Sequence, residues 1–220
     1  MTKKYYCIAP SSDNSVGIVP QANETEDGYN YSAENSIYVL SKTYCSPVRS
    51  DIDIRLKLDK HARLTDIISS SFFSSYQGLF ISERLKSLLQ NFKLPPHQII
   101  PGSIKVKEHR VNYFWLHFTS DLNDIIDFSK TEFIKYDPVT KNRENLYFRS
   151  ADEFKNTTRA IKGLTVINAH NVLLKECDYD LLNLIYLPTG LLVSDRLLDN
   201  LEKDAISGYS VIKSVNGSRA

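Results

Sequence analysis

The sequence contains few of the residues that build cross-linked or metal-bound folds. Its 220 residues include 3 cysteines, and these are far apart. Cys7, Cys45 and Cys177 therefore favour reduced core thiols over a disulfide framework or a zinc site. The chain also lacks a glycine-rich phosphate loop and a His-Glu-x-x-His pattern, so we predict no cofactor and no metal site.

Long apolar runs and an excess of charge of either sign are also missing. No stretch approaches the roughly 18 to 20 consecutive apolar residues of a membrane span, and the first residues contain no apolar run of signal-peptide length. The 27 basic and 26 acidic residues give a formal net charge of +1, which offers no long-range attraction to nucleic acid or anionic membranes. We expect a cytoplasmic protein that binds neither nucleic acid nor a membrane.

One motif occurs twice and organises the chain. Residues 78–85 read Gly-Leu-Phe-Ile-Ser-Glu-Arg-Leu, and residues 190–197 read Gly-Leu-Leu-Val-Ser-Asp-Arg-Leu. In each copy the apolar residues predict a short buried strand, and the serine predicts a helix N-cap with an acid in the first turn. Leucines at helical spacing follow. The sequence therefore predicts two similar strand–helix units, at residues 78–92 and 190–204.

Strand patterns fill much of the remaining chain. Ile52, Ile54, Leu56 and Leu58 alternate with charged residues, which predicts a strand with one buried face. Residues 99–106 and 111–118 predict two more strands. The second of these is so rich in aromatic residues that we expect it to lie inside a sheet, covered on both faces.

Further strands and one more helix complete the prediction. Residues 36–41 and 133–136 have strand character, and Ser150 with Glu153 has the spacing of a capping box at the start of a helix. The predicted fold class is α+β, with mainly antiparallel sheet and a few amphipathic helices.

The chain divides into two parts that we expect to form one unit. Residues 1–63 are β-rich and include a long polar loop at residues 10–35. Residues 64–220 contain both copies of the motif. Loops as long as residues 10–35 are uncommon inside domains unless they are functional or mobile.

Histidine and serine patterns give little evidence for catalysis. His117 lies in the aromatic strand, where a lone histidine is typical of a hydrogen-bonded core residue. Ser82 and Ser194 lie in strand-to-helix turns, but Phe80 and Arg84 stand where a nucleophile elbow needs glycines. We therefore predict two helix caps and no catalytic residue.

Arg84 and Arg196 occupy the same place in both copies, in the first turn of the predicted helix. A cation gains nothing from the helix dipole there. A carboxylate partner elsewhere in the fold, or a surface that faces another protein, would explain both residues.

Acidic and aromatic residues in the long loop are candidates for contact with a partner. Interfaces favour aromatic anchors and complementary charges. A loop without a role is the alternative. The candidates are Glu24, Glu26, Asp27, Tyr29 and Tyr31.

A second acidic segment contains Asp121, Asp124 and Asp127. On a helix, this spacing would place three carboxylates on one side, where they could bind a hard cation or a basic partner. The alternative is a solvated acidic turn that binds no ligand, and we favour it over a metal site. We keep the three residues as candidate partner contacts.

The order of these elements resembles a known family. The first copy, the aromatic strand at residues 113–118, the segment at residues 125–129, and the second copy followed by Ile-Ser-Gly-Tyr at residues 206–209 are similar to immunity proteins of bacterial polymorphic toxin systems. The match covers roughly residue 64 to the C-terminus. The resemblance implies an α+β protein without enzymatic activity that binds a cognate secreted toxin domain and blocks it.

Two other classes remain open from the sequence. One is an enzyme acting on a small molecule through a site that only the fold assembles. The other is a structural or oligomerisation module.

Overall fold

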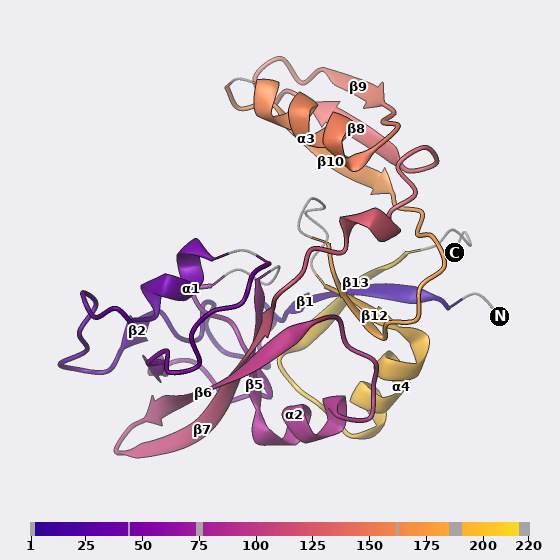
Figure 1. Cartoon of the computed structure of the whole chain (residues 1–220). Helices are drawn as coiled ribbons and strands as arrows, with labels where there is room; N and C mark the ends of the chain where they lie inside the picture. The colour runs from indigo at the N-terminus through magenta and orange to yellow at the C-terminus, as the bar shows by residue number, and fades with distance from the viewer. Residues whose placement is uncertain (1–2, 44, 74–76, 162, 185–190, 216–220) are drawn as a thin grey trace.

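Three β-sheets carry the fold across the residues that the structure describes (Figure 1). This computed structural model describes residues 3–43, 45–73, 77–161, 163–184 and 191–215. All strand pairs of the six-stranded sheet are antiparallel except the pair β3–β6. Its order is β2 (Glu24–Thr25), β3 (Arg55–Lys57), β6 (His97–Val106), β7 (His109–Phe118), β5 (Gly78–Ser82) and β4 (Ile67–Ile68).

The four-stranded sheet is antiparallel throughout, in the order β11 (Leu181–Asn183), β12 (Leu191–Ser194), β1 (Tyr5–Pro10) and β13 (Tyr209–Val215). A three-stranded sheet with the helix α3, drawn at the top of Figure 1, shares one buried apolar cluster with the four-stranded sheet, in which Phe133 and Phe154 join Tyr5 and Leu192. Its elements are β10 (Val166–Asn171), β8 (Glu132–Tyr136), β9 (Arg143–Leu146) and α3 (Ala151–Ala160). The fold is α+β with mainly antiparallel sheets, which confirms the predicted class.

The two copies of the motif form the units β5–α2 (α2, Glu83–Leu89) and β12–α4 (α4, Asp195–Lys203). A short strand precedes each unit and pairs antiparallel with the strand of that unit, in the same register in both. Ile67 of β4 lies opposite Ile81, the residue before Ser82, and Leu181 of β11 lies opposite Val193, the residue before Ser194. Both predicted strand–helix units are confirmed, except that Gly190 lies outside the described residues.

The equivalence extends to the neighbouring strands. Tyr113 of β7 lies opposite Ser82, and Tyr5 of β1 lies opposite Ser194. The Tyr113 hydroxyl donates to the carbonyl of Thr65 over 2.5 Å, and the Tyr5 hydroxyl donates to the carbonyl of Tyr179 over 2.7 Å. β6 and β7 therefore correspond to β13 and β1, although β1 comes from the other end of the sequence.

An apolar core lies between the two units. Leu85 and Leu88 of α2 join Leu197 and Leu201 of α4 in one buried cluster that also takes residues from both larger sheets. The other face of the six-stranded sheet packs on a second cluster around Trp115. The apolar stripes predicted on both helices are thus buried against sheets and against each other.

Several strands agree with the sequence prediction. Ile52, Ile54 and Leu56 are buried in alternation as predicted, but the strand β3 covers only Arg55–Lys57. The aromatic strand β7 lies between β6 and β5, inside the six-stranded sheet. The Ser150 hydroxyl accepts from the Glu153 amide over 3.2 Å and begins α3 as predicted.

One strand prediction is wrong. Residues 36–41 were expected to form a strand, but Tyr38–Lys42 form the helix α1. Ile37 and Leu40 are buried and lie three residues apart, so a helix turns both side chains toward the core. A strand would have needed a neighbouring strand as its pairing partner.

Asn123–Ile125 form a single 3₁₀ turn, η1.

The N-terminal part is built into the later sheets. β1 lies between β12 and β13, and β3 pairs with β6, so the boundary predicted at residue 63 does not separate the sheets. Residues 10–35 include β2 and contain Val16, Gln21 and Ala22, each with no exposed surface. This segment is packed against the body of the protein.

Among the described residues, no helix has both the length and the apolar composition needed to cross a membrane.

Candidate functional site

Asp66 anchors a hydrogen-bond cluster at the N-terminus of α2. Its carboxylate is buried and accepts from the Ser82 hydroxyl over 2.7 Å and from Arg84 Nε over 3.1 Å. It also accepts from the Ser207 backbone amide over 2.9 Å and from the Ser207 hydroxyl over 2.8 Å. We call Asp66, Ser82, Arg84 and Ser207 the Asp66 cluster.

Asp180 anchors the equivalent cluster at the N-terminus of α4. Its buried carboxylate accepts from the Ser194 hydroxyl over 2.9 Å, from Arg196 over 3.1 Å and from the Lys93 backbone amide over 2.9 Å. Asp180, Ser194, Arg196 and Lys93 form the Asp180 cluster. A carboxylate partner for each repeated arginine, one of the two explanations predicted from the sequence, is thereby confirmed.

Each cluster joins the two units. Arg84 donates to the carbonyl of Ala205, which follows α4, over 2.9 Å. Arg196 donates to the carbonyl of Asn91, which follows α2, over 3.1 Å. Ser207 and Lys93 come from the same two segments. The start of each helix is therefore bonded to the end of the other.

Hydrogen bonding keeps both carboxylates charged. Burial alone would raise the pKa of Asp66, but hydrogen bonds from Arg84, Ser82 and Ser207 outweigh burial and lower this pKa to about 2. Burial opposes a lower pKa at Asp180 as well, and the Lys93 amide and Ser194 hydroxyl overcome it.

The two serines are helix caps, as predicted. The hydroxyl of Ser82 accepts from the Leu85 amide and that of Ser194 accepts from the Leu197 amide, each over 3.2 Å. Each hydroxyl also donates its proton to an aspartate that is held by an arginine. The lowered pKa of Asp66 and of Asp180 makes each carboxylate a weak base, and the contacts of both serines are those of helix caps.

His117 is a hydrogen-bonded core residue, as its position in β7 predicted. It is fully buried; its Nδ1 accepts from Trp115 Nε1 over 3.3 Å and its Nε2 donates to the carbonyl of Ser46 over 2.9 Å. Burial lowers the pKa of His117 below its ordinary value, so the ring is neutral at pH 7.

Two candidates from the long loop lie inside the protein. Glu26 is buried and forms an ion pair with Arg110, and the buried Tyr29 donates its hydroxyl to the carbonyl of Asp53 over 2.5 Å. Neither is free for a surface contact, because β2 and its turn pack them against neighbouring strands.

The other three loop candidates are exposed. Glu24 pairs with Lys57 over 3.5 Å, and Asp27 lies in an exposed turn. Tyr31 has 40% of its surface exposed and packs against Tyr38 with ring centroids 5.2 Å apart. These three remain candidate partner contacts.

The acidic segment does not form one carboxylate face. η1 covers only Asn123–Ile125, so Asp121 lies before it and Asp127 after it. Asp121 accepts from the Asn123 amide over 3.1 Å, Asp124 is exposed, and Asp127 pairs with Lys130 over 2.9 Å. No group of three metal-ligating side chains occurs among the described residues. A solvated acidic turn that binds no ligand fits these contacts.

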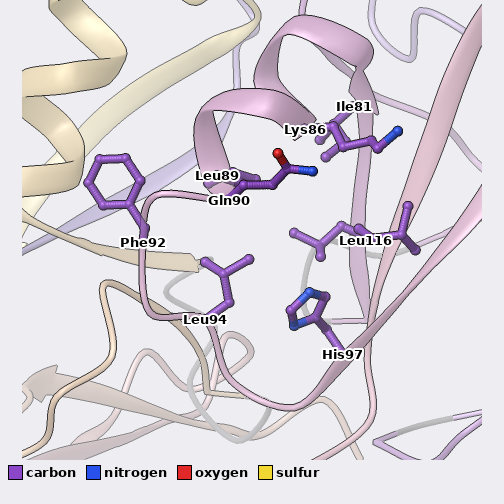
Figure 2. A pocket seen from close by; sticks show the side chains of 9 residues that line it. Ile81, Lys86, Leu89, Gln90, Phe92, Leu94, His97 and Leu116 are labelled. Carbon is purple, nitrogen blue, oxygen red and sulfur yellow. The ribbon is translucent and has the colours of Figure 1, made fainter.

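A groove that sequence analysis missed lies beside α2. Figure 2 shows its side chains, which come from α2, from β5, β6 and β7, and from the segment that joins α2 to β6. Its volume is ≈ 190 Å³. We call it the α2 groove; its apolar walls are Ile81, Leu89, Phe92, Leu94, Ile99 and Leu116, and Lys86, Gln90 and His97 supply its polar groups.

Two polar side chains at the groove have unused hydrogen-bonding capacity. His97 Nδ1 lies 2.7 Å from the carbonyl of Pro95, and because a carbonyl only accepts, Nδ1 carries the proton. Nε2 of the neutral ring is then an acceptor. In the described part of the chain, neither this atom nor the Gln90 amide has a hydrogen-bond partner, and Figure 2 shows both side chains beside the groove.

The residues of the groove lie between Ile81 and Leu116 in sequence, and the strand register together with the position of α2 brings them together. Ile99 lies opposite Leu116 in the β6–β7 pair, and α2 covers the same face of the sheet. Phe92 was expected on the apolar stripe of the helix, but α2 ends at Leu89, so Phe92 lines the groove with Leu94 from the segment that follows.

Comparison of the sequence with models of known protein families and with curated proteins gives no match.

Proposed function

We propose that the protein is a cytoplasmic immunity protein that binds the toxic domain of a cognate secreted toxin and neutralises it by direct contact. The resemblance of its element order to immunity proteins of polymorphic toxin systems supports this class. The proposal requires no catalysis and no cofactor.

The size of the surface cavities is the observation that carries the proposal. Three of the cavities that described residues line measure ≈ 100, ≈ 190 and ≈ 270 Å³. Sites for small molecules usually enclose about 300 to 1,000 Å³. These three cavities are below that size and fit single side chains of a protein partner better than a substrate, which supports docking.

The two clusters supply the rigidity that docking needs. Asp66 and Asp180 each bond the two units together, so the surface around α2 and α4 is ordered before a partner arrives. Binding then costs less conformational entropy. With a net charge of +1, affinity has to come from local contacts and buried anchors.

Co-expression with the toxic domain encoded beside the gene tests the proposal. We expect cells to survive the toxin only when this protein is present, and we expect a one-to-one complex by size-exclusion chromatography with light scattering. Absence of protection contradicts the proposal. Protection at substoichiometric amounts, with chemical alteration of the toxin, would favour an enzyme instead.

A second candidate is self-association through β13. This strand lies at an edge of the four-stranded sheet, and its residues Val211 and Ile212 have 45% and 58% of their surface exposed. An exposed apolar edge can pair with another copy. A concentration-dependent dimer in sedimentation experiments, lost in Val211→Lys, would favour this candidate.

A further inference from the structure

The second unit shows how a groove of this kind can be closed. Register identifies the residue equivalent to His97: Phe118 lies opposite His97, and Pro10 lies opposite Tyr209. Phe118 follows Tyr113 by the same number of residues as Pro10 follows Tyr5. Tyr209 is therefore the counterpart of His97.

Tyr209 covers the corresponding face in the second unit. It is half-buried against the cluster that contains Leu197, Leu198 and Leu201 of α4. Burial raises the pKa of its hydroxyl, and the nearby Glu202 carboxylate adds to this effect. Glu202 follows Ser194 at the distance at which Gln90 follows Ser82, so it is the counterpart of Gln90.

The first unit has the equivalent strand and helix positions, but histidine stands in the place of Tyr209. His97 is smaller than tyrosine and exposed, its Nδ1 is held by Pro95, and the space beside it is the ≈ 190 Å³ groove. A cavity of this size takes a single large side chain and is too small for a cofactor. Its apolar walls favour an aromatic ring, since aromatic rings bury a large apolar area.

The polar atoms select the kind of ring. Nε2 of neutral His97 accepts a hydrogen bond, and the Gln90 amide both donates and accepts. A phenol hydroxyl satisfies such groups, whereas phenylalanine leaves them unpaired. Lys86 is already occupied, because its ammonium lies 3.8 Å from the centroid of Phe114 and pairs with Glu83.

We propose that the α2 groove receives one tyrosine side chain of the protein partner, with the ring against Leu89 and Leu116 and the hydroxyl on His97. The site takes from the partner the residue that the second unit supplies from its own chain. This inference rests on the proposed function, under which the partner is the toxic domain.

Titration of the labelled protein with N-acetyl-tyrosinamide tests the groove without the toxin. We expect saturable NMR shifts at the Gln90 side-chain amide in the millimolar range. N-acetyl-phenylalaninamide should bind roughly 3- to 10-fold more weakly, because it lacks one hydrogen bond. No saturation, or binding of N-acetyl-leucinamide as tight as that of the tyrosine analogue, overturns the proposal.

Two substitutions of His97 separate the ring from the hydroxyl contact. His97→Tyr should close the groove with the chain's own ring and abolish the shifts at an unchanged or higher melting temperature. His97→Ala should leave the groove open and remove the preference for tyrosine over phenylalanine. The matched control is His109→Tyr, an exposed position at the other end of the β6–β7 hairpin, which should bind like the wild type. Unchanged binding in His97→Tyr, or an unchanged preference in His97→Ala, overturns the proposal.

The toxin assay distinguishes this inference from the proposed function. We expect the wild type to protect cells, and His97→Tyr to weaken the complex at least tenfold while His109→Tyr does not. That result supports the proposed function and the proposal for the α2 groove. If His97→Tyr protects cells fully and binds the toxic domain with unchanged affinity, the proposal for the α2 groove is wrong and the proposed function still stands. If the wild type gives no protection, the proposed function fails, and the titration alone decides whether the groove takes tyrosine.

Discussion

Asp66 and Asp180 occupy equivalent places, directly before β4 and β11, and each binds the backbone that follows the helix of the other unit. The Asp66 carboxylate accepts from the Ser207 amide and the Asp180 carboxylate accepts from the Lys93 amide, both over 2.9 Å. This reciprocal bonding makes the two units one body. Their independent unfolding is not expected.

Asp66→Asn should lower the free energy of unfolding by about 2 kcal/mol, because the carboxylate accepts several hydrogen bonds and each bond to a buried charged group contributes on the order of 1.5–3 kcal/mol, not additively. Urea denaturation followed by circular dichroism measures the change. Asp51→Asn is the control: Asp51 pairs with Arg49 at the surface and should leave the urea midpoint unchanged. An equal loss in both variants would contradict the role of Asp66.

The Asp66 cluster should also shape the stability of the protein in acid. The pKa of Asp66 in the folded protein is about 2, below its ordinary value of 3.8. Its contribution is therefore fully present above about pH 5 and is lost as pH falls through the folded pKa. Urea titrations between pH 5 and pH 2 should show a shallower decline in Asp66→Asn than in the wild type. An identical decline would show that other carboxylates dominate this range.

Tyr5→Phe and Tyr113→Phe should have similar effects, because each hydroxyl donates to the backbone carbonyl that precedes the anchoring aspartate. Loss of one such bond costs about 1 kcal/mol. Thermal or urea unfolding of the two variants checks this, with Tyr147→Phe as the exposed control. A large effect at one tyrosine and none at the other would argue against the equivalence of β1 and β7.

His117 should titrate below the ordinary histidine pKa, since burial disfavours the charged ring. Its stabilising effect as a neutral residue is present above about pH 6.5 and is lost as pH falls through the lowered folded pKa. NMR titration of the imidazole signals measures this pKa, and the same protein unfolded in urea provides the reference. A folded pKa at or above the reference value would contradict the neutral core assignment.

Local pattern predicted the parts of the fold that depend on near neighbours in sequence. The caps at Ser82, Ser194 and Ser150 were predictable because a hydroxyl bonds an amide three residues away. The alternation of Ile52, Ile54 and Leu56 was predictable because a strand turns successive side chains to opposite faces. Residues 36–41 were predicted wrongly, since a short apolar run fits either a strand or a helix until its packing partners are known.

The sequence by itself determined the two capped strand–helix units, the aromatic inner strand and the α+β class, because spacing and propensity act over a few residues. Only the tertiary structure decided which carboxylates hold Arg84 and Arg196, that Glu26 and Tyr29 are buried, and that a groove lies beside α2. Arg84 and Asp66 lie 18 residues apart and Glu26 and Arg110 lie 84 residues apart, and pairing over such distances depends on strand register and core packing that no local pattern records.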